Sequence, residues 1–482
     1  MCGIIGIASI TKVINRTWLA DGREAIRHRG PDSSGEWWSN DGAVGLGHVR
    51  LAVIDLSSFA NQPMHDNGEE LTIVFNGEIY NFNELRKTLI AKGYAFKSHS
   101  DTEVILASYR EWGTDCLSHF NGMFAFALYD KRKQEIFLAR DCAGEKPLYF
   151  ALNNGELRFA SELKGLMADR FFSRNISHDA LDCYLNMGYV PGDLCILKGV
   201  KKLQAGYAMV FNHQSGKSKS WRYWDIQDLE ESSGTTLPDE LLLADELEDL
   251  LESSVRRQLV ADVPVGILLS GGIDSSLVTA MASRITSNLK TFTVRFPRYP
   301  QHDESEYARL IASHFNTEHI ELDISEITPD ILPLLARQFD EPIADSSMIP
   351  SYLIAQLVRK HCTVALGGDG GDELFGGYGY DRLLRMQKIL NIIPKSARVL
   401  LSKSSEIFLP VGFKGRNYLQ GFSADLQTSL PLMTSFFDRT LRKKLLSGWS
   451  SLALNAEYIR EQRVPNHTDL LQRVTRMDFK NF

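Results

Sequence analysis

Hydrophobic and polar positions follow one pattern in the first half of the chain and another in the second. Up to about residue 210, short apolar runs alternate with Gly, Asn and Asp clusters, a pattern typical of strands joined by turns. The clearest runs are LTIVFNGEIY (71–80), FAFALYD (124–130) and EIFLAR (135–140). Helices are predicted from Asn83 to Lys92 and from about Thr102 to Trp112, with Asp101 as the N-cap of the second. Residues 1–210 are therefore predicted to form one strand-rich domain.

Strands and helices alternate in the second half. The polar stretch 211–240 is predicted to be a linker. Residues 243–260 have helical periodicity, and residues 383–482 are predicted to be mainly helical. The strands predicted between them are GILL (266–269), TFTVRF (291–296) and TVALGG (363–368). Repeated strand–turn–helix units predict a doubly wound parallel sheet, so a second domain is expected at residues 241–482.

Composition narrows the class of protein. A chain of 482 residues suits two or three domains, and 44% apolar with 23% charged residues is the profile of a globular protein. The net charge of −7 provides no basic surplus for a phosphate backbone, which argues against nucleic-acid binding. No apolar run reaches the roughly 18 residues of a membrane helix. The six cysteines lack CxxC spacing and are expected to be reduced thiols, so we expect a cytoplasmic protein without membrane contact.

A glycine-rich turn, Ser270 to Ser276, joins the strand GILL to the following helix. The backbone N–H groups of such a turn, together with the helix dipole, form a cradle for phosphate. Asp274 would repel a bare phosphate, so its presence suggests a bridging Mg²⁺. The turn has neither the Walker nor the dinucleotide-binding spacing. The alternative is a plain strand-to-helix turn.

A second glycine loop, residues 366–378, follows the strand TVAL and carries three acidic residues. Loops at the carboxyl ends of parallel strands share one crevice. Both loops are therefore expected to face the same pocket, where Asp274 and Asp372 would hold Mg²⁺ on a pyrophosphate. The alternative is a solvated acidic loop.

Cys2 follows the initiator methionine. If Met1 is removed, Cys2 combines a thiol nucleophile with a free α-amine that can act as its base. Asn76-Gly77 offers an amide and a backbone N–H for an oxyanion hole. Arg50 and Asp101 are a pair suited to the carboxylate and ammonium groups of a free amino acid. The alternative for Cys2 is a small buried apolar residue.

Together these motifs resemble the glutamine-dependent asparagine synthetase family. The resemblance covers nearly the whole chain. The matching stretches are MCGIIGI (1–7), RHRGPDSSG (27–35), GHVRLAVIDLS (47–57), NQPM (61–64), FNGEIYNFNEL (75–85), SDTEVI (100–105), FNGMFAFALYD (120–130), ARDCAGEKPLYF (139–150), SGGIDSS (270–276) and GDGGDELFGGY (368–378).

The resemblance implies a fold for each half. The first half would be an N-terminal-nucleophile hydrolase, an α/β/β/α four-layer sandwich with glutaminase activity. The second would be an ATP-pyrophosphatase domain of the adenine nucleotide alpha hydrolase type. The catalytic residues implied are Cys2, Asn76, Gly77 and Asp369, and the glutamine-binding residues are Arg50, Asn76, Gly77, Glu78 and Asp101. The implied ATP-binding residues are Leu268, Ser270, Gly271, Gly272, Asp274, Ser275, Ser276, Val294 and Gly368, with Asp274 and Asp372 as metal ligands.

The resemblance also implies a reaction. Ammonia is freed from glutamine through a thioester, and ATP with Mg²⁺ adenylates a small carboxylate, expected to be aspartate. Ammonia then passes through an internal tunnel and displaces AMP, because a bare carboxylate is a poor electrophile. Family members are often homodimers, but the sequence does not determine the oligomeric state.

Two departures from the family pattern leave alternatives open. Asp369 stands where many members have Glu, and the acceptor region 340–352 has no arginine matching the one that holds aspartate. These features resemble branches that amidate a sugar carboxylate for surface polysaccharides. The segment 473–482 resembles the stretch just before the family's last helices, so we expect a chain truncated there. A third interpretation is therefore a non-synthetic member of the family, with glutaminase activity only or with a regulatory or assembly role.

Overall fold

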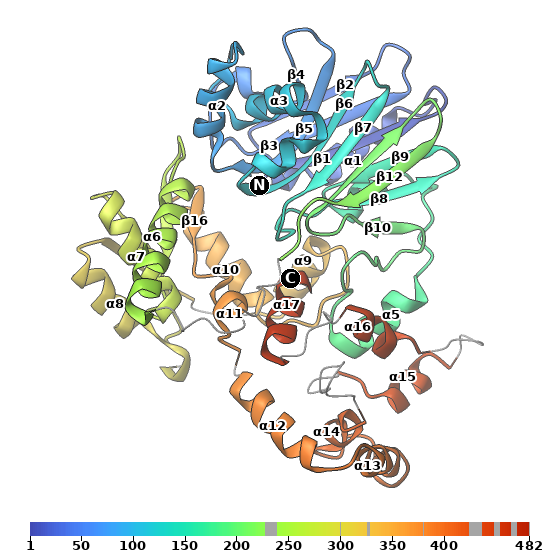
Figure 1. Ribbon diagram of the computed structural model, residues 1–482, viewed down its shortest axis with the longest axis vertical. Coiled ribbons are helices and arrows are strands. Elements are labelled where there is room, and N and C mark those ends of the chain that lie inside the picture. Colours follow the sequence, from blue (N-terminus) through green and yellow to red (C-terminus); the bar gives the residue numbers. More distant parts are fainter. Residues whose placement is uncertain are drawn as a thin grey trace.

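The computed structural model describes residues 1–226, 239–298, 300–324, 328–378, 380–423, 436–447, 454–463 and 470–481. The N-terminal half contains two six-stranded antiparallel sheets (Figure 1). The first sheet has the order β10 (Val200–Lys202), β8 (Tyr149–Asn153), β9 (Glu156–Ala160), β1 (Gly3–Ser9), β3 (Val44–Arg50) and β2 (Ser33–Trp38). The second has the order β12 (Lys217–Arg222), β11 (Tyr207–Asn212), β7 (Glu135–Arg140), β6 (Gly122–Asp130), β5 (Leu71–Ile79) and β4 (Met64–His65).

The two sheets pack face to face between helices, which confirms the predicted α/β/β/α sandwich. Successive side chains of a strand point to opposite faces. In β1, Ile4 packs between the sheets with Val74 of β5, whereas Ile5 packs outward with Leu19 of α1. The helices of this half are α1 (Thr17–Ala25), α2 (Phe82–Ala91), α3 (Asp101–Trp112), α4 (Leu163–Met167) and α5 (His178–Met187). Helices α2 and α3 cover the second sheet, and α1 and α4 cover the first.

Two local predictions for this half were wrong. Ser100, not Asp101, is the N-cap of α3, because the Ser100 hydroxyl accepts the N–H of Thr102 at 3.0 Å. Asp101 is instead the first helical residue, and its carboxylate accepts the N–H of Ile79. The expected linker is also shorter than predicted: residues 217–222 form β12, which pairs with β11, so the sandwich continues past residue 210. Residues 227–238 of that linker lie outside the described residues.

The C-terminal half contains a parallel sheet, as predicted for a doubly wound domain. Its order is β15 (Glu318–Asp323), β14 (Lys290–Arg295), β13 (Val265–Leu268) and β16 (Val364–Leu366), all parallel. Ile267 packs against α6 (Glu240–Gln258) and α7 (Ile273–Ile285), and Phe292 packs on the other face against α10 (Met348–Val358). Of the other helices in this half, α8 (Ser305–His314) contacts β14 and β15, whereas α9 (Ile331–Gln338) contacts α10 and α11 (Gly371–Phe375) contacts α17 (Leu470–Asn481) near the end of the chain.

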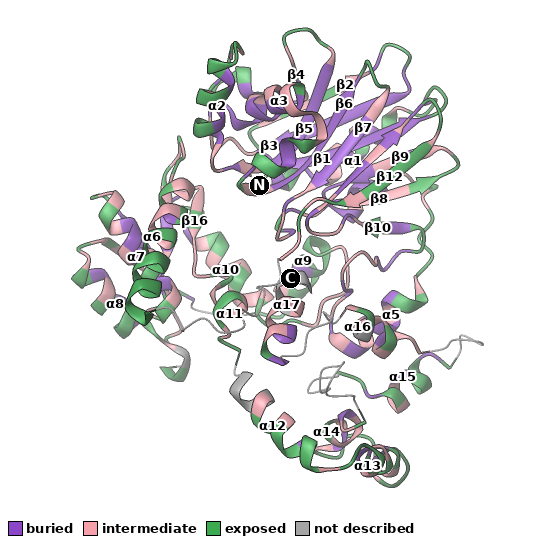
Figure 2. Ribbon diagram, viewed as in Figure 1, coloured by how far each residue is buried: buried purple, intermediate pink, exposed green. Residues whose placement is uncertain are grey.

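The described part of the chain after residue 383 is mainly helical, in agreement with the prediction. Its helices are α12 (Tyr380–Ile392), α13 (Lys395–Phe408), α14 (Arg416–Gly421), α15 (Arg439–Leu445), α16 (Ala456–Arg463) and α17 (Leu470–Asn481). The buried Arg442 of α15 bonds Asp182 of α5 at 2.6 Å and so ties this region to the N-terminal half. Figure 2 shows that burial is concentrated in the two N-terminal sheets, whereas α12 and α13 are largely exposed. Within the described residues, none of the helices is long and apolar enough to span a bilayer.

Candidate active sites

A cavity of about 330 Å³ lies at the end of β5 and contains the whole predicted glutamine site. We call it the glutamine cavity. Its lining includes Cys2, Arg50, Asn76, Gly77, Glu78 and Asp101. Cys2 directly precedes β1, and the others come from β3, β5 and the start of α3, so the sandwich brings distant motifs together. Thr363 to Ala365, at the start of β16, also line it. The cavity is therefore bounded by both halves of the chain.

The thiol of Cys2 lies beside the chain terminus in this cavity. Its Sγ lies 3.6 Å from the carbonyl of Leu51, and burial raises the pKa of the thiol. Burial lowers the pKa of the Met1 α-amino group to about 6. An amine in this environment is mostly unprotonated at neutral pH. That the α-amine of Cys2 takes the thiol proton after removal of Met1 stays a prediction.

Asn76 and Gly77 have the features of an oxyanion hole. The Asn76 side chain is fully buried, and neither its Nδ2 nor its Oδ1 has a hydrogen-bond partner within the described chain. Such unpaired buried groups are costly unless a ligand completes them. Position 77 needs glycine because the backbone of β6 lies very close to it: a Cβ there would lie 2.1 Å from the carbonyl oxygen of Met123.

Glu78 and Asp101 supply negative charge to the same cavity. Burial, then the charge of Asp101, raises the pKa of Glu78 to about 7. Burial raises the pKa of Asp101 to about 6. A substrate ammonium group would favour the ionised form of both carboxylates.

Arg50 has a further role that the sequence did not reveal. Its Nη1 donates to the carbonyl of Ser57 at 3.0 Å and to Oδ1 of Asn61 at 2.9 Å. Its Nη2 donates to the carbonyls of Ile54 and Asp55. The guanidinium thus orders the loop after β3, and its expected binding of the glutamine carboxylate stays a prediction.

A second cavity, about 370 Å³, lies at the carboxyl ends of β13, β14 and β16. We call it the nucleotide cavity. It contains most of the predicted nucleotide site: Leu268, Ser270, Gly272, Asp274, Ser275, Val294, Gly368 and Asp369. Three predicted residues do not line it, namely Gly271, Ser276 and Asp372. Gly271 has φ +87° and packs against Tyr307 of α8, so it shapes the turn.

The two glycine loops touch at Asp274. A Cβ on Gly371 would lie 2.6 Å from Cγ of Asp274, so only glycine leaves room for that carboxylate. Asp274 and Asp369 both line the cavity and are oxygen ligands of the kind Mg²⁺ prefers. Asp372 instead packs against Gly377 of its own loop. Among the described residues, no group of three or more His, Cys, Asp and Glu side chains forms a ready metal cluster. The role of Asp372 as a metal ligand stays a prediction.

Other residues at the two cavities escaped the sequence analysis. Lys146 lines the glutamine cavity, and burial lowers its pKa. Glu304 lines the nucleotide cavity. Lys146 lies in the stretch GEKPLYF, and the match of this stretch to the family could have indicated Lys146 as a site residue. Glu304 precedes α8 and has no local pattern that marks it.

Fold and cavities together define a glutamine amidotransferase joined to an ATP-dependent synthetase. Comparison with known families agrees: residues 1–224 match the glutamine amidotransferase domain, and residues 246–482 match asparagine synthase. The chain is 36% identical over 424 residues to a putative glutamine-hydrolysing asparagine synthetase 2 of Methanocaldococcus jannaschii, covering 84% of this chain and 80% of that protein. It is 35% identical over 459 residues to the glutamine-hydrolysing asparagine synthetase 1 of Bacillus subtilis, covering 93% and 70%.

The chain belongs to the glutamine-hydrolysing asparagine synthetase family. It is thus a glutamine-dependent amidating ligase that uses glutamine and ATP. Among solved structures, a B. subtilis glutamine phosphoribosylpyrophosphate amidotransferase aligns with TM-score 0.35 and 15% identity over 76% of this chain and 81% of that chain. An ammonia-dependent NAD synthetase of Campylobacter jejuni aligns with TM-score 0.20 and 19% identity over 29% and 61%.

Proposed function

We propose that this protein converts aspartate, glutamine and ATP to asparagine, glutamate, AMP and pyrophosphate. The observation that supports it most directly is the position of β16. Thr363 to Ala365 line the glutamine cavity, and Gly367 to Asp369 line the nucleotide cavity. Two extended residues span only about 7 Å. Ammonia released at one cavity thus has a short path to the other.

In the glutaminase step, the Cys2 thiolate attacks the amide carbon of glutamine. Asn76 Nδ2 and the N–H of Gly77 stabilise the resulting oxyanion. The α-amine of Cys2, protonated by the thiol proton, passes that proton to the amide nitrogen; the C–N bond breaks and ammonia leaves, which gives a thioester. Water then hydrolyses the thioester to glutamate and restores the thiol. Glu78 and Asp101 hold the substrate ammonium, and Arg50 its carboxylate.

In the synthetase step, the acceptor carboxylate attacks the α-phosphorus of ATP, and pyrophosphate leaves. Backbone N–H groups and hydroxyls of the 270–276 turn bind the phosphates. Mg²⁺, held by Asp274 with Asp372, would supply positive charge to the departing pyrophosphate. Ammonia then attacks the acyl carbon of the adenylate, AMP leaves, and Asp369 accepts the surplus proton. The six cysteines are free, which fits our proposal of a cytoplasmic enzyme.

One observation supports a second acceptor class. In the described part of the chain, the lining of the nucleotide cavity includes neither lysine nor arginine. Aspartate brings a second carboxylate and an ammonium group, whereas a sugar acid brings one carboxylate and several hydroxyls. A sugar carboxylate therefore makes a smaller demand on cationic side chains and is our second candidate acceptor.

Pyrophosphate release tests this proposal. The full chain is incubated with ATP, Mg²⁺ and glutamine, and with aspartate, glucuronate or no acceptor. Equal amounts of pyrophosphate and asparagine, only with aspartate, would support the proposal. Pyrophosphate only with glucuronate would support the second candidate. Glutamate without pyrophosphate under all conditions would overturn both and favour a glutaminase-only or regulatory member.

A further inference from the structure

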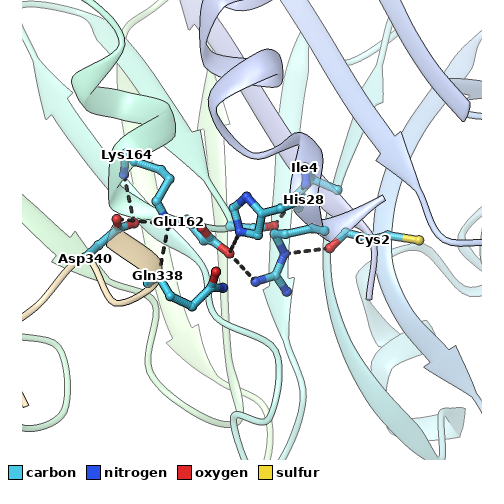
Figure 3. A network of polar contacts seen from close by, with 9 residues as sticks. Cys2, Ile4, His28, Glu162, Lys164, Gln338 and Asp340 are labelled. Atoms are coloured by element: carbon cyan, nitrogen blue, oxygen red, sulfur yellow. Dashed lines mark hydrogen bonds and ion pairs between the residues drawn. The ribbon is translucent and has the colours of Figure 1, made fainter. Parts of the chain in front are cut away.

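A chain of polar contacts connects the backbone of Cys2 with the C-terminal half. Arg29 Nε donates to the carbonyl oxygen of Cys2 at 2.8 Å, and Arg29 Nη1 bonds Oε1 of Glu162 at 2.7 Å. Lys164 Nζ bonds Oε2 of Glu162. The same Nζ lies 3.1 Å from Oδ1 of Asp340, and the backbone N–H of Lys164 donates to Oδ2 of Asp340 at 2.8 Å. Figure 3 shows this line of contacts, with the carbonyl of Cys2 toward the network and its sulfur pointing the other way.

The charged groups in this network are largely removed from water. The side chains of Arg29, Glu162 and Asp340 are only 7%, 10% and 8% exposed. Burial at Glu162 is outweighed by hydrogen bonds from His28, Lys164 and Arg29, which lower its pKa to about 2. A buried ion pair fixes geometry strongly, because breaking it leaves an uncompensated charge.

The segment around Glu162 contacts β1 at a second point next to the nucleophile. Ser161 accepts the N–H of Ile4 through its Oγ at 2.9 Å, and its own N–H donates to the carbonyl of Ile4 at 2.8 Å. Residues 161–164 therefore hold the backbone on both sides of Gly3. A shift of this segment would be expected to move Cys2 relative to Asn76 and Gly77.

The far end of the network belongs to a segment that reaches the nucleotide cavity. Asp340 lies between α9 and α10, and Ile354 of α10 lines that cavity. Glu341, the next residue, is held separately by Lys202 Nζ at 2.9 Å and by the N–H of Ile196 at 2.7 Å. Two neighbouring carboxylates thus bind the N-terminal half, but of these contacts only those of Asp340 lead on to Cys2.

We propose that Glu162 is a positioning residue for Cys2 and that Lys164 transmits to it the position of the Asp340 segment. Glutamine hydrolysis then depends on where the α9–α10 segment sits, and so on the state of the nucleotide cavity. This inference rests on the proposed role of Cys2. The alternative is that Lys164 only docks the two halves, as Lys202 does through Glu341.

The experiment compares Lys164→Met with Lys202→Met in the full chain. Each change removes one cation that bridges to the Asp340–Glu341 segment. Glutamate formation from glutamine is measured without acceptor, with and without ATP and Mg²⁺, to obtain kcat and KM. Lys164→Arg tests rescue by another cation. A double variant, Lys164→Met with Asp340→Asn, removes both charges and provides a foldable form if the single variant aggregates.

We expect Lys164→Met to lower kcat about tenfold or more with an unchanged KM, because a misplaced nucleophile slows the reaction while the ammonium site stays intact. Lys202→Met should leave kcat unchanged, and Lys164→Arg should restore it. ATP should alter kcat in the parent chain but not in the double variant. Equal effects of Lys164→Met and Lys202→Met, or an unchanged ATP response in the double variant, would overturn the inference. A parent chain that hydrolyses glutamine but does not amidate aspartate would refute only the proposed acceptor.

Discussion

The carboxylate of Asp262 accepts a hydrogen bond from the backbone N–H of Asp55 at 2.7 Å, and the N–H of Asp262 donates to the carbonyl of Val53 at 3.0 Å. These bonds join the segment before β13 to the loop after β3. Val53 lines the glutamine cavity, and Asp55 provides a carbonyl that binds Arg50. The C-terminal half therefore holds one wall of the glutamine cavity in place.

Removal of this contact should weaken glutamine binding selectively. Asp262→Ala leaves the N–H of Asp55 without its partner and loosens the loop that Arg50 orders. We expect KM for glutamine to rise severalfold, while synthesis from ammonium chloride stays unchanged. Asp245→Asn, at an exposed position of α6, is the control. An equal loss of ammonia-dependent synthesis would show that Asp262 acts on the whole fold instead.

Cys2→Ala should abolish glutamine use and spare ammonia use. The reason is that the thiol forms the thioester, whereas free ammonia enters the synthetase step directly. Pyrophosphate release with either nitrogen source measures both. Cys142→Ala, which changes another free and half-buried thiol, should leave both activities intact. Glutamate formation by Cys2→Ala would refute the assignment of the nucleophile.

Asn76→Ala should separate activity from stability. Loss of an oxyanion donor typically lowers kcat by about 10²–10³. Because both polar atoms of Asn76 are buried without a partner among the described residues, their removal should not lower the melting temperature. Glutaminase kinetics and thermal unfolding test the two parts. A strong drop in melting temperature would instead indicate a structural role for this side chain.

Much of the fold could be predicted from the sequence because local patterns carry it. The period of two in β1 sends Ile4 to one face and Ile5 to the other, which is what a two-sheet sandwich needs. The boundary between the N-terminal sandwich and the linker was harder to predict. Strand β12, KSKSWR, is mostly exposed and polar, so its pattern resembles a linker, and only its pairing with β11 reveals it.

The candidate sites were predictable where short motifs carry the chemistry. Cys2, Asn76 and Asp101 were predicted in this way to share one site, and they line one cavity, while their roles stay predictions. Nothing in the sequence indicated a link between Arg29 and Glu162, because 133 residues separate them. The same holds for Lys164 and Asp340, which are 176 residues apart. No local pattern encodes such contacts, since the first depends on how distant elements pack within the N-terminal half and the second on how the two halves pack.

Glutamine use should fall as the pH drops below about 7. Glu78 and Asp101 must be ionised to hold the substrate ammonium, and their pKa values are raised to about 7 and about 6. The rate constant kcat/KM for glutamine should therefore decline in two steps. Glu78→Gln should lower kcat/KM overall and remove the step near pH 7. A parent profile that is flat from pH 6 to 8 would contradict this assignment.

The same raised pKa of Glu78 has the opposite consequence for stability. The folded chain keeps the proton up to about pH 7, whereas the unfolded chain loses it near 4.5. The native state binds more protons in this window, so the contribution of Glu78 to the free energy of unfolding decreases as the pH rises through it. Urea unfolding from pH 5 to 8 should show a flatter slope in Glu78→Gln than in the parent. An identical slope would show that Glu78 titrates normally.

Gly371→Ala should disable the synthetase site and leave the glutaminase site active. The new Cβ would lie 2.6 Å from Cγ of Asp274, so the Asp274 carboxylate must move from the place where the two glycine loops meet. Pyrophosphate release should be lost with either nitrogen source, while glutamate formation continues, because Cys2 and Asn76 are untouched. Gly68→Ala is a matched control, since no atom lies closer than 3.7 Å to its new Cβ. Normal pyrophosphate release by Gly371→Ala would mean that Asp274 is not needed where it lies, and would refute its role at the phosphates.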